Sequence, residues 1–281
     1  MRDHQATMFA DDLLLLESPR WHDGRLWVAD ILDHKVYTLA ADGTRSVVCE
    51  VPHQPIGMGF LPDGTLVIAS KKDRRLMKLV DGQLVLHADL SGYATGDLND
   101  LVVDDLGNVY IGNFGYDIDG GEPKKSSDLH MAAPDGSVRV AASGVEFPNG
   151  MVITDGGRTL IGAETWASRL LAYDRAADGT LSNCRIYAEL GNQQPDGICI
   201  DAAGGIWIAG YETGEVVRIR ADGTITDRIR CGGRAIACAL GGADGRTLFS
   251  VTYQGGGADL EASKRLATVL KTDVSPDQPK T

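Results

Sequence analysis

Asparagine and acidic side chains precede β-like segments at several places in this chain. Asn149 stands before a glycine in FPNGMVITDGGRTLIGAET, and Asp196 takes the same place in QPDGICIDAAGGIWIAGYET. Glu17 and Asn99 open the comparable segments ESPRWHDGRLWVAD and NDLVVDDLGNVYIGN. Amide and carboxylate oxygens without accompanying Cys or His suit a hard divalent cation such as Ca²⁺, Mg²⁺ or Mn²⁺. The alternative interpretation is turn chemistry, because Asn and Asp also favour turns.

A metal ion held by such oxygens could support ester or lactone hydrolysis. A cation bound by three side chains keeps coordination positions open, polarises a carbonyl and lowers the pKa of its bound water. Serine-based hydrolysis is not indicated, because the chain has no GxSxG segment and its Ser, His and Asp residues show no triad spacing. Metal-activated water is therefore the chemistry that these residue types favour.

The candidate residues recur because the chain itself is repetitive. Six segments, about 40 to 50 residues apart, begin with apolar or small residues, cross a Gly-rich turn and continue into a second β-like run. A third run and usually a fourth follow each of them, and four short antiparallel strands per unit are typical of a propeller blade. The sequence predicts an all-β, six-bladed β-propeller, with a solenoid or a sandwich as the structural alternative.

The last repeat offers only three strand-like runs, so another part of the chain must complete it. We expect the N-terminal run 5–14 to supply its outer strand, which removes an exposed sheet edge. Residues 1–281 are then expected to form a single domain, with 272–281 as a loose tail.

Propeller geometry predicts which residues meet. The first strand of each blade lines the central channel and the second runs antiparallel beside it, so the start of the first and the end of the second share one face. The first strands are expected to start at Glu17, Pro55 or Ile56, Asn99, Asn149, Asp196 and Arg234. The second strands are expected to end near 30–32, 70–71, 113–117, 164–166, 210–212 and 252–254. Four oxygen-bearing side chains, those of Glu17, Asn99, Asn149 and Asp196, should therefore converge on one axis.

Composition favours a soluble, turn-rich protein that does not bind nucleic acid. The 281 residues include 35 glycines and carry a formal net charge of -12, whereas a phosphate backbone requires clustered Lys and Arg. The five cysteines form no CxxC pair and are interpreted as reduced thiols. The N-terminus lacks the pattern of a secretory signal, and no run approaches the ~20 apolar residues of a membrane span. We therefore expect no membrane association and a cytoplasmic location.

The chain resembles the regucalcin and gluconolactonase family of metal-dependent six-bladed propellers over nearly its whole length. LESPRW resembles the family's Gly-Glu-x-Pro-x-Trp start, with Leu16 in place of the glycine. FPNGMVIT is similar to its Asn-Gly-Leu motif, and PDGICIDAAGGIWIA to its Pro-Asp-Gly-x-x-x-Asp segment. The resemblance implies that Glu17, Asn149 and Asp196 bind one divalent metal, for which Ca²⁺ is favoured over Mn²⁺, Mg²⁺ and Zn²⁺. It also implies that Asp196 accepts a proton, and Asp100 is the other candidate for that role.

One motif departs from the family pattern. Members that act on sugar lactones carry Arg-x-Asn-Asp-Gly where this chain reads DLNDL, so Asp97 replaces the arginine and Leu101 the glycine. The resemblance keeps Asn99, and by position Asp97, as candidate substrate-binding residues. Reversal of a charge at a hydroxyl-binding position changes substrate choice, so gluconolactone itself is not the expected substrate.

Further substrate contacts are expected where the second strands of the third and fourth blades end. The ungapped match places Asn113 and Phe114 in the family's Gly-Thr-Met stretch and Asp117 at its acidic substrate-contacting position. Trp166 and other aromatic residues at strand ends indicate a more apolar pocket than a sugar requires. The segment 113–130 is either a solvated loop or a lid over the site.

The sequence thus predicts a metal-dependent hydrolase that opens a lactone or cleaves a small ester. Three alternatives stay open: a propeller that binds Ca²⁺ or a small ligand without turnover, a protein-interaction propeller, and a non-hydrolytic enzyme that uses the same metal as a Lewis acid. The motifs encode neither the natural substrate nor the oligomeric state.

Overall fold

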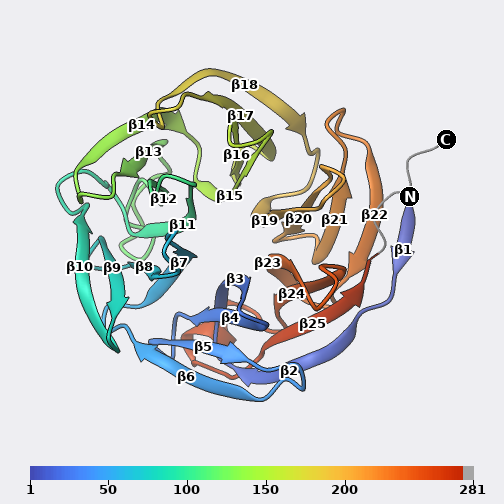
Figure 1. Ribbon diagram of the computed structural model, residues 1–281. Helices are drawn as coiled ribbons and strands as arrows, with labels where there is room; N and C mark the ends of the chain where they lie inside the picture. The colour runs from blue at the N-terminus through green and yellow to red at the C-terminus, as the bar shows by residue number, and fades with distance from the viewer. Residues whose placement is uncertain (275–281) are drawn as a thin grey trace.

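Residues 1–274 are described by a computed structural model and form six β-sheets arranged radially around one axis (Figure 1). Within each sheet, the strands that follow one another in the chain pair antiparallel. The first strand of every blade lies nearest the axis and the last lies at the rim (Figure 1). The predicted six-bladed, all-β propeller with four antiparallel strands per blade is therefore confirmed.

Blades 1 to 3 each consist of four consecutive strands. Blade 1 contains β3 (Leu16–His22), β4 (Arg25–Asp30), β5 (Lys35–Leu39) and β6 (Arg45–Glu50). Blade 2 contains β7 (Pro55–Phe60), β8 (Leu66–Ser70), β9 (Arg75–Val80) and β10 (Gln83–Asp89). Blade 3 contains β11 (Leu98–Val103), β12 (Val109–Asn113), β13 (Ser127–Ala132) and β14 (Val138–Val145).

The N-terminal strands join blades 5 and 6. Blade 4 contains β15 (Pro148–Thr154), β16 (Thr159–Glu164), β17 (Arg169–Arg175) and β18 (Leu181–Glu189). Blade 5 contains β19 (Pro195–Ile200), β20 (Ile206–Gly210), β21 (Glu215–Ile219), β22 (Ile225–Arg230) and, at its outer edge, β1 (Arg2–His4). Blade 6 contains β23 (Arg234–Gly241), β24 (Thr247–Tyr253), β25 (Ala267–Asp273) and β2 (Thr7–Leu13).

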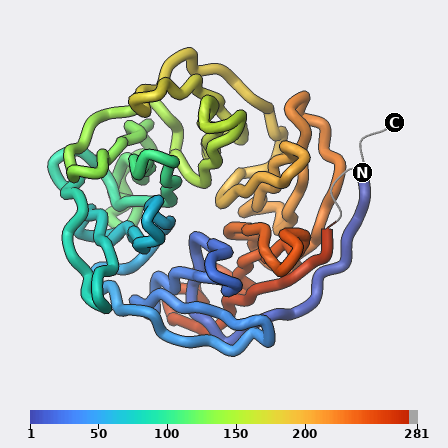
Figure 2. Tube along the Cα trace, in the orientation of Figure 1, coloured from blue at the N-terminus to red at the C-terminus, as the bar shows by residue number. Residues whose placement is uncertain are grey.

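The two ends of the chain close the ring together. Strand β2 pairs antiparallel with β25 and completes blade 6, as the sequence predicted. Strand β1 adds a parallel pairing with β22 that was not anticipated, and His4 Nε2 lies 2.8 Å from Asp227 Oδ1 there. Figure 2 shows the N-terminal segment running along the outside of blades 5 and 6. The first 13 residues thus cover the outer edges of two blades.

The C-terminal region is more ordered than the predicted loose tail. Thr272 and Asp273 belong to β25 and Val274 is buried, because this strand lies between β24 and β2. The remaining part of the expected tail, 275–281, lies outside the described residues. In the described part of the chain the only helix is α1 (Gly257–Glu261), and no helix is long or apolar enough to cross a bilayer.

Glycines allow the innermost strands to approach one another closely. A Cβ atom on Gly57 would lie 2.6 Å from the Asn99 carbonyl oxygen of the next blade. One on Gly150 would lie 2.5 Å from the backbone nitrogen of Ile198. Gly150 does not have a positive φ, so glycine is needed here for its lack of a side chain rather than for its backbone conformation. The glycine that follows Asn149 therefore serves packing between blades.

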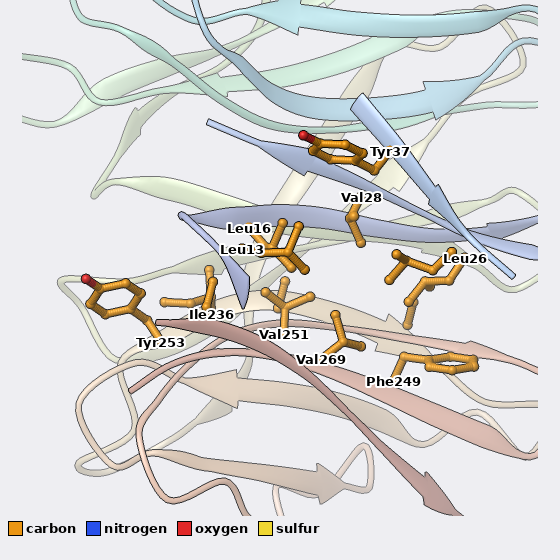
Figure 3. Close-up of a cluster of buried hydrophobic side chains, with 14 residues drawn as sticks. Leu13, Leu16, Leu26, Val28, Tyr37, Ile236, Phe249, Val251, Tyr253 and Val269 are labelled. Atoms are coloured by element: carbon orange, nitrogen blue, oxygen red, sulfur yellow. The ribbon is translucent and has the colours of Figure 1, made fainter. Parts of the chain in front are cut away.

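Neighbouring blades pack on apolar side chains. Between blades 1 and 6, Leu16 and Val28 of blade 1 pack with Val251 and Val269 of blade 6, and Leu13 of β2 is buried in the same cluster (Figure 3). Leu13 is fully buried, although most of β2 is exposed. The end of the N-terminal segment is therefore anchored in the core as well as paired at a sheet edge.

We expect removal of residues 1–13 to damage the fold far more than removal of residues 1–5. The longer deletion exposes the edge of β25 and removes the buried Leu13 side chain, a loss of about 2–5 kcal/mol by analogy with large-to-small core substitutions. The shorter deletion removes only the β1 pairing and the His4–Asp227 contact. Thermal unfolding and size-exclusion chromatography compare the two proteins. A monodisperse 14–281 fragment with unchanged unfolding temperature would contradict the closure described here.

Candidate active site

One pocket lies on the axis at the end where the first strands of the blades begin. Its volume is about 310 Å³, and residues from all six blades line it. Glu17, Asn99, Asn149 and Asp196 all contribute to its surface, so the structure brings the four predicted residues together. All four side chains are buried from solvent. Most other lining residues are aliphatic or aromatic, so the polar groups form a small patch in an apolar pocket.

Irregular strand pairing positions three of these side chains. In β11, β15 and β19, pairing with the second strand is interrupted between the first and fourth residues. Asn99, Asn149 and Asp196 are the second residues of these strands and lie inside the interruptions. A bulge of this kind releases a residue from the alternation of the ladder and redirects its side chain. Because these residues lie in strands, turn formation does not explain their identity.

A threonine fixes the orientation of the Asn149 amide. Thr165 Oγ1 donates its proton to the carbonyl oxygen of Pro195 at 2.7 Å, so it can only accept from Asn149 Nδ2, which lies 3.2 Å away. The amide nitrogen is thereby used, while Asn149 Oδ1 is buried without a hydrogen-bond partner. The free oxygen is left as an acceptor at the pocket.

The two carboxylates are held in an unfavourable environment. Burial, reinforced by the charge of Asp100, raises the pKa of Asp196 to about 8, although the Asn149 side chain partly offsets the rise. Burial, followed by the charges of Asp196 and Asp100, raises the pKa of Glu17 well above its ordinary value. Asp196 Oδ1 has no hydrogen-bond partner, and Glu17 Oε2 accepts only the backbone N–H of Ser18 at 3.1 Å. The site has more buried negative charge and more free acceptors than its own donors satisfy.

These oxygens are chemically suited to a divalent cation. Two carboxylates and one amide oxygen are hard donors, and a cation would relieve both the repulsion and the unpartnered acceptors. Within residues 1–274, no group of three or more His, Cys, Asp and Glu side chains is arranged to hold a metal. The Asn149 amide would complete a set of three oxygen ligands with Glu17 and Asp196.

Asp100 is buried close to the candidate ligands, but it does not line the pocket. Its Oδ1 atom accepts hydrogen bonds from Ser18 Oγ at 2.9 Å, Arg20 Nη2 at 2.8 Å and the backbone N–H of Leu101 at 2.8 Å. The contact with Arg20 is an ion pair that occupies the Asp100 carboxylate. Of the two candidate proton acceptors, only Asp196 contributes to the pocket surface.

Three of the predicted substrate-binding residues line the pocket. Asn99 donates through Nδ2 to the carbonyl oxygen of Pro148 at 3.0 Å, which ties blade 3 to blade 4. Phe114 and Trp166 form an aromatic wall with Phe147, whose ring centroid lies 4.8 Å from each of theirs. The expectation of an apolar pocket agrees with this arrangement.

The other three predicted substrate-binding residues do not reach the pocket surface. Asp97 turns toward two lysines and lies 2.7 Å from Lys72 Nζ. Asn113 is fully buried and uses its amide to hold the following segment, by accepting from the Gly115 N–H at 3.0 Å and donating to the Asp128 carbonyl oxygen at 2.9 Å. Asp117 is exposed and accepts the N–H of Gly120 at 2.8 Å. Alignment of these positions with a motif gave their place in the chain but not the direction of their side chains.

The segment between β12 and β13 forms one side of the pocket. Phe114 and Ile118 line it, and Tyr116 is buried and accepts a hydrogen bond from Trp166 Nε1 at 3.1 Å. Residues 117–126 are exposed. The segment therefore combines a wall fixed by Phe114 and Tyr116 with a solvated outer part.

Sequence reasoning gave no role to three polar residues that line the pocket: Lys71, Thr165 and Arg234. All three fall at the expected strand starts or ends of the repeat, which was the available signal. Residue type alone did not distinguish these three residues from others at strand ends. Their contacts in the folded ring distinguish them as pocket residues.

Comparison with known proteins places this chain in a family. Residues 15–254 match the family model of the SMP-30/Gluconolactonase/LRE-like region. The chain is 32% identical over 256 residues to a pentonolactonase of Haloferax volcanii, covering 88% of this chain and 84% of that protein, and 28% identical over 247 residues to a 6-deoxy-6-sulfogluconolactonase of Pseudomonas putida, covering 84% and 82%. The solved structure of the calcium-binding protein regucalcin from Agrobacterium tumefaciens shares the fold, with a TM-score of 0.81 at 23% identity and coverage of 98% and 97%. This chain belongs to the SMP-30/gluconolactonase/LRE-like family.

Proposed function

We propose that this protein is a metal-dependent lactonase in which Glu17, Asn149 and Asp196 hold one divalent cation. The observation that carries the proposal is the pair of buried, unpartnered oxygens, Asn149 Oδ1 and Asp196 Oδ1, in two residues that line a pocket large enough for a small organic ligand. Relatives across most of the chain are named lactonases, which supports ring opening of a lactone as the reaction.

The cation would supply polarisation of the lactone carbonyl and activation of water for attack on it. Ca²⁺ is favoured because the three ligands are all oxygen atoms and because a regucalcin with the same fold is described as calcium-binding. Mn²⁺, Mg²⁺ and Zn²⁺ are the alternatives, since oxygen-rich sites accept several ions and their availability decides among them.

The residues of the chain divide the remaining tasks. Asp196 is the proton acceptor of the proposal, because it lines the pocket while Asp100 is occupied by Arg20 and Ser18. Asn99 orients the polar end of the substrate from blade 3. Phe114 and Trp166 pack against its apolar part and exclude water from that side of the pocket.

The pocket favours a lactone with an apolar body over a polyhydroxylated sugar lactone. Its walls are mainly aliphatic and aromatic, and they offer few groups that could satisfy many hydroxyls. Asp97, at the position of the family's sugar-contacting arginine, does not line the pocket. Gluconolactone would leave hydroxyls unpaired on the apolar side, and that mismatch lowers its kcat/KM.

Hydrolysis should require a divalent cation and the Asp196 carboxylate. We expect purified protein to open apolar lactones in the presence of Ca²⁺, Mn²⁺, Mg²⁺ or Zn²⁺ and to lose this activity in EDTA. Asp196→Asn should lose bound metal by mass spectrometry and lower kcat by at least about 100-fold, the usual range for loss of a general base. Asp117→Asn, which changes an exposed carboxylate outside the pocket, is the matched control.

Two results would count against the proposal. Stoichiometric metal retained by Asp196→Asn would remove Asp196 from the ligand set. Metal binding without chelator-sensitive turnover of any lactone would instead support a propeller that binds Ca²⁺ without catalysis.

Thr165 should control metal affinity without touching the metal. Thr165→Val keeps the shape of the side chain but removes the acceptor of Asn149 Nδ2, so the amide no longer has a fixed orientation. Loss of such a supporting group weakens metal binding by roughly tenfold or more. Thr165→Ser, which retains the hydroxyl, should bind the metal almost as tightly as the native protein. Competition with a chromophoric chelator measures both affinities, and equal affinity of the Val and Ser variants would show that Thr165 does not position Asn149.

The metal-free protein should lose stability as the pH rises. The pKa of Asp196 rises from 3.8 to about 8 on folding, so the folded chain binds more protons than the unfolded chain between these values. In EDTA, the free energy of unfolding should therefore decrease as pH rises through that range. Asp196→Asn, a neutral mimic of the protonated acid, should flatten the profile, and Asp117→Asn should leave it unchanged. Urea titrations at a series of pH values test this, and native and Asp196→Asn profiles of equal slope would contradict it.

A further inference from the structure

Two basic side chains line the same pocket as the candidate metal ligands and have no role in the proposed hydrolysis. Lys71 directly follows β8 in blade 2, and Arg234 is the first residue of β23 in blade 6. We propose that Lys71 and Arg234 together bind an anionic group of the substrate, so that the enzyme prefers a lactone that carries a carboxylate on an apolar body. This inference rests on the proposed lactonase function and names its substrate class.

Lys71 is held in a largely buried position at the pocket. Its side chain is 14% exposed, and its Nζ atom lies 5.1 Å from the ring centroid of Phe114. Burial lowers the pKa of Lys71, because the ammonium group loses solvation there. An anion that entered the pocket would restore a favourable partner for this charge.

The nearby carboxylate of Asp97 leaves Lys71 free for another partner. Asp97 Oδ2 lies 3.5 Å from Lys71 Nζ but only 2.7 Å from Lys72 Nζ. Lys72 is more exposed, does not line the pocket and also pairs with Asp119. Asp97 therefore has its shorter contact outside the pocket. An ammonium group has three donors, and a single long contact with Asp97 does not saturate Lys71.

Arg234 is the more available of the two cations. Its guanidinium carbon lies 5.1 Å from the ring centroid of Tyr211, another pocket residue. Across residues 1–274, no hydrogen bond or ion pair to the Arg234 side chain is found. A guanidinium group stays protonated and presents a planar fork of donors that matches a carboxylate. The stacking contact holds its position without using those donors.

The balance of charges in the pocket also supports a ligand with an anionic group. Glu17 and Asp196 are the two acidic residues that line it, and Lys71 and Arg234 are the two basic ones. One divalent cation balances the two carboxylates, so Arg234 has no counter-charge among the pocket-lining residues and Lys71 has only the 3.5 Å contact with Asp97. The whole chain has a net charge of -12, so its overall field repels anions. Selection of an anion must therefore come from these local groups.

Arg234 lies against Tyr211, away from the aromatic wall, whereas Lys71 borders that wall at Phe114. Blades 2 and 6, which carry Lys71 and Arg234, flank blade 1, whereas Phe147 and Trp166 belong to the opposite part of the ring around blade 4 (Figure 1). A ligand can thus place an anionic group toward blade 1 and its apolar body toward blades 3 and 4. Its lactone carbonyl would then lie near the axis, where Glu17, Asn149 and Asp196 line the pocket.

A matched pair of substrates tests the inference directly. One is a γ-lactone with a short alkyl carboxylate side chain, and the other is the same lactone with that carboxylate converted to a primary amide. We expect the native protein to hydrolyse the carboxylate form with at least about tenfold higher kcat/KM, the value of one charge-assisted hydrogen bond. The preference should appear mainly in KM, because the anionic group is bound equally in the ground and transition states.

Variants assign the preference to the two residues. Lys71→Met and Arg234→Gln should each reduce the ratio of kcat/KM for the carboxylate lactone to that for the amide lactone by about threefold, and the double variant should erase the preference. Lys71→Arg should retain most of it. Lys72→Met is the matched control, since it removes the same charge from the adjacent residue outside the pocket. Circular dichroism and thermal unfolding confirm that each variant is folded.

The outcomes separate this inference from the proposed function. Equal hydrolysis of the two lactones, or an equal loss in Lys72→Met and Lys71→Met, would overturn the inference and leave the lactonase intact. If neither lactone is hydrolysed with any divalent ion, the proposed function fails. Calorimetric titration of the carboxylate and amide lactones into the native and Lys71→Met proteins then decides the inference: selective binding of the carboxylate that Lys71→Met weakens supports it, and equal binding overturns it.

Discussion

The geometry of the site depends on how closely the innermost strands of adjacent blades approach one another. A Cβ atom on Gly197 would lie 2.4 Å from the Cβ atom of Ala237 in the next blade, a separation that packed atoms do not tolerate. Gly150 and Gly197 directly follow the candidate ligands Asn149 and Asp196. The same contact that allows six blades to close into a ring therefore sets how far apart the ligand oxygens stand. At Asn149-Gly150 and Asp196-Gly197, close packing between blades therefore leaves no room for a side chain after the candidate ligand.

Ring closure concentrates charge that the fold alone does not stabilise. Glu17, Asp196 and Asp100 come from three different blades and are buried within one small region, where the charge of Asp100 raises the pKa of both Glu17 and Asp196 and the charge of Asp196 raises that of Glu17 further. Arg20 offsets part of this charge through Asp100, but within residues 1–274 neither Glu17 nor Asp196 forms an ion pair with a basic side chain. A site selected only for stability would replace one of them with a neutral residue. Their joint presence is best explained by a ligand of opposite charge, and the unpartnered oxygen of Asn149 has the same explanation.

The sequence predicted the features that repetition dictates and missed those that depend on side-chain direction. Blade number, the closing strand β2 and the convergence of four polar residues all result from the spacing of six similar segments. Strand β1 has three residues and no apolar alternation, because backbone pairing and the His4–Asp227 contact hold it, so no pattern marked it. Asn113 sits at the predicted place but turns its amide into the loop beside it. Thr165 acts through hydrogen bonds to residues on two strands, and no linear motif records such a contact.

Asp97 and Lys71 show why the charge of a pocket cannot be predicted from one motif. Asp97 reverses the charge of the arginine found in sugar-lactone members, yet its carboxylate pairs with Lys72 outside the pocket lining. The basic group that does reach the pocket at this corner comes from the neighbouring blade, at Lys71. A ring of similar strands offers several backbone positions from which a side chain can reach nearly the same point. Substrate choice among such propellers should therefore depend on the summed charge and polarity of all six blades, and a lost motif residue can be replaced by one that is remote in sequence.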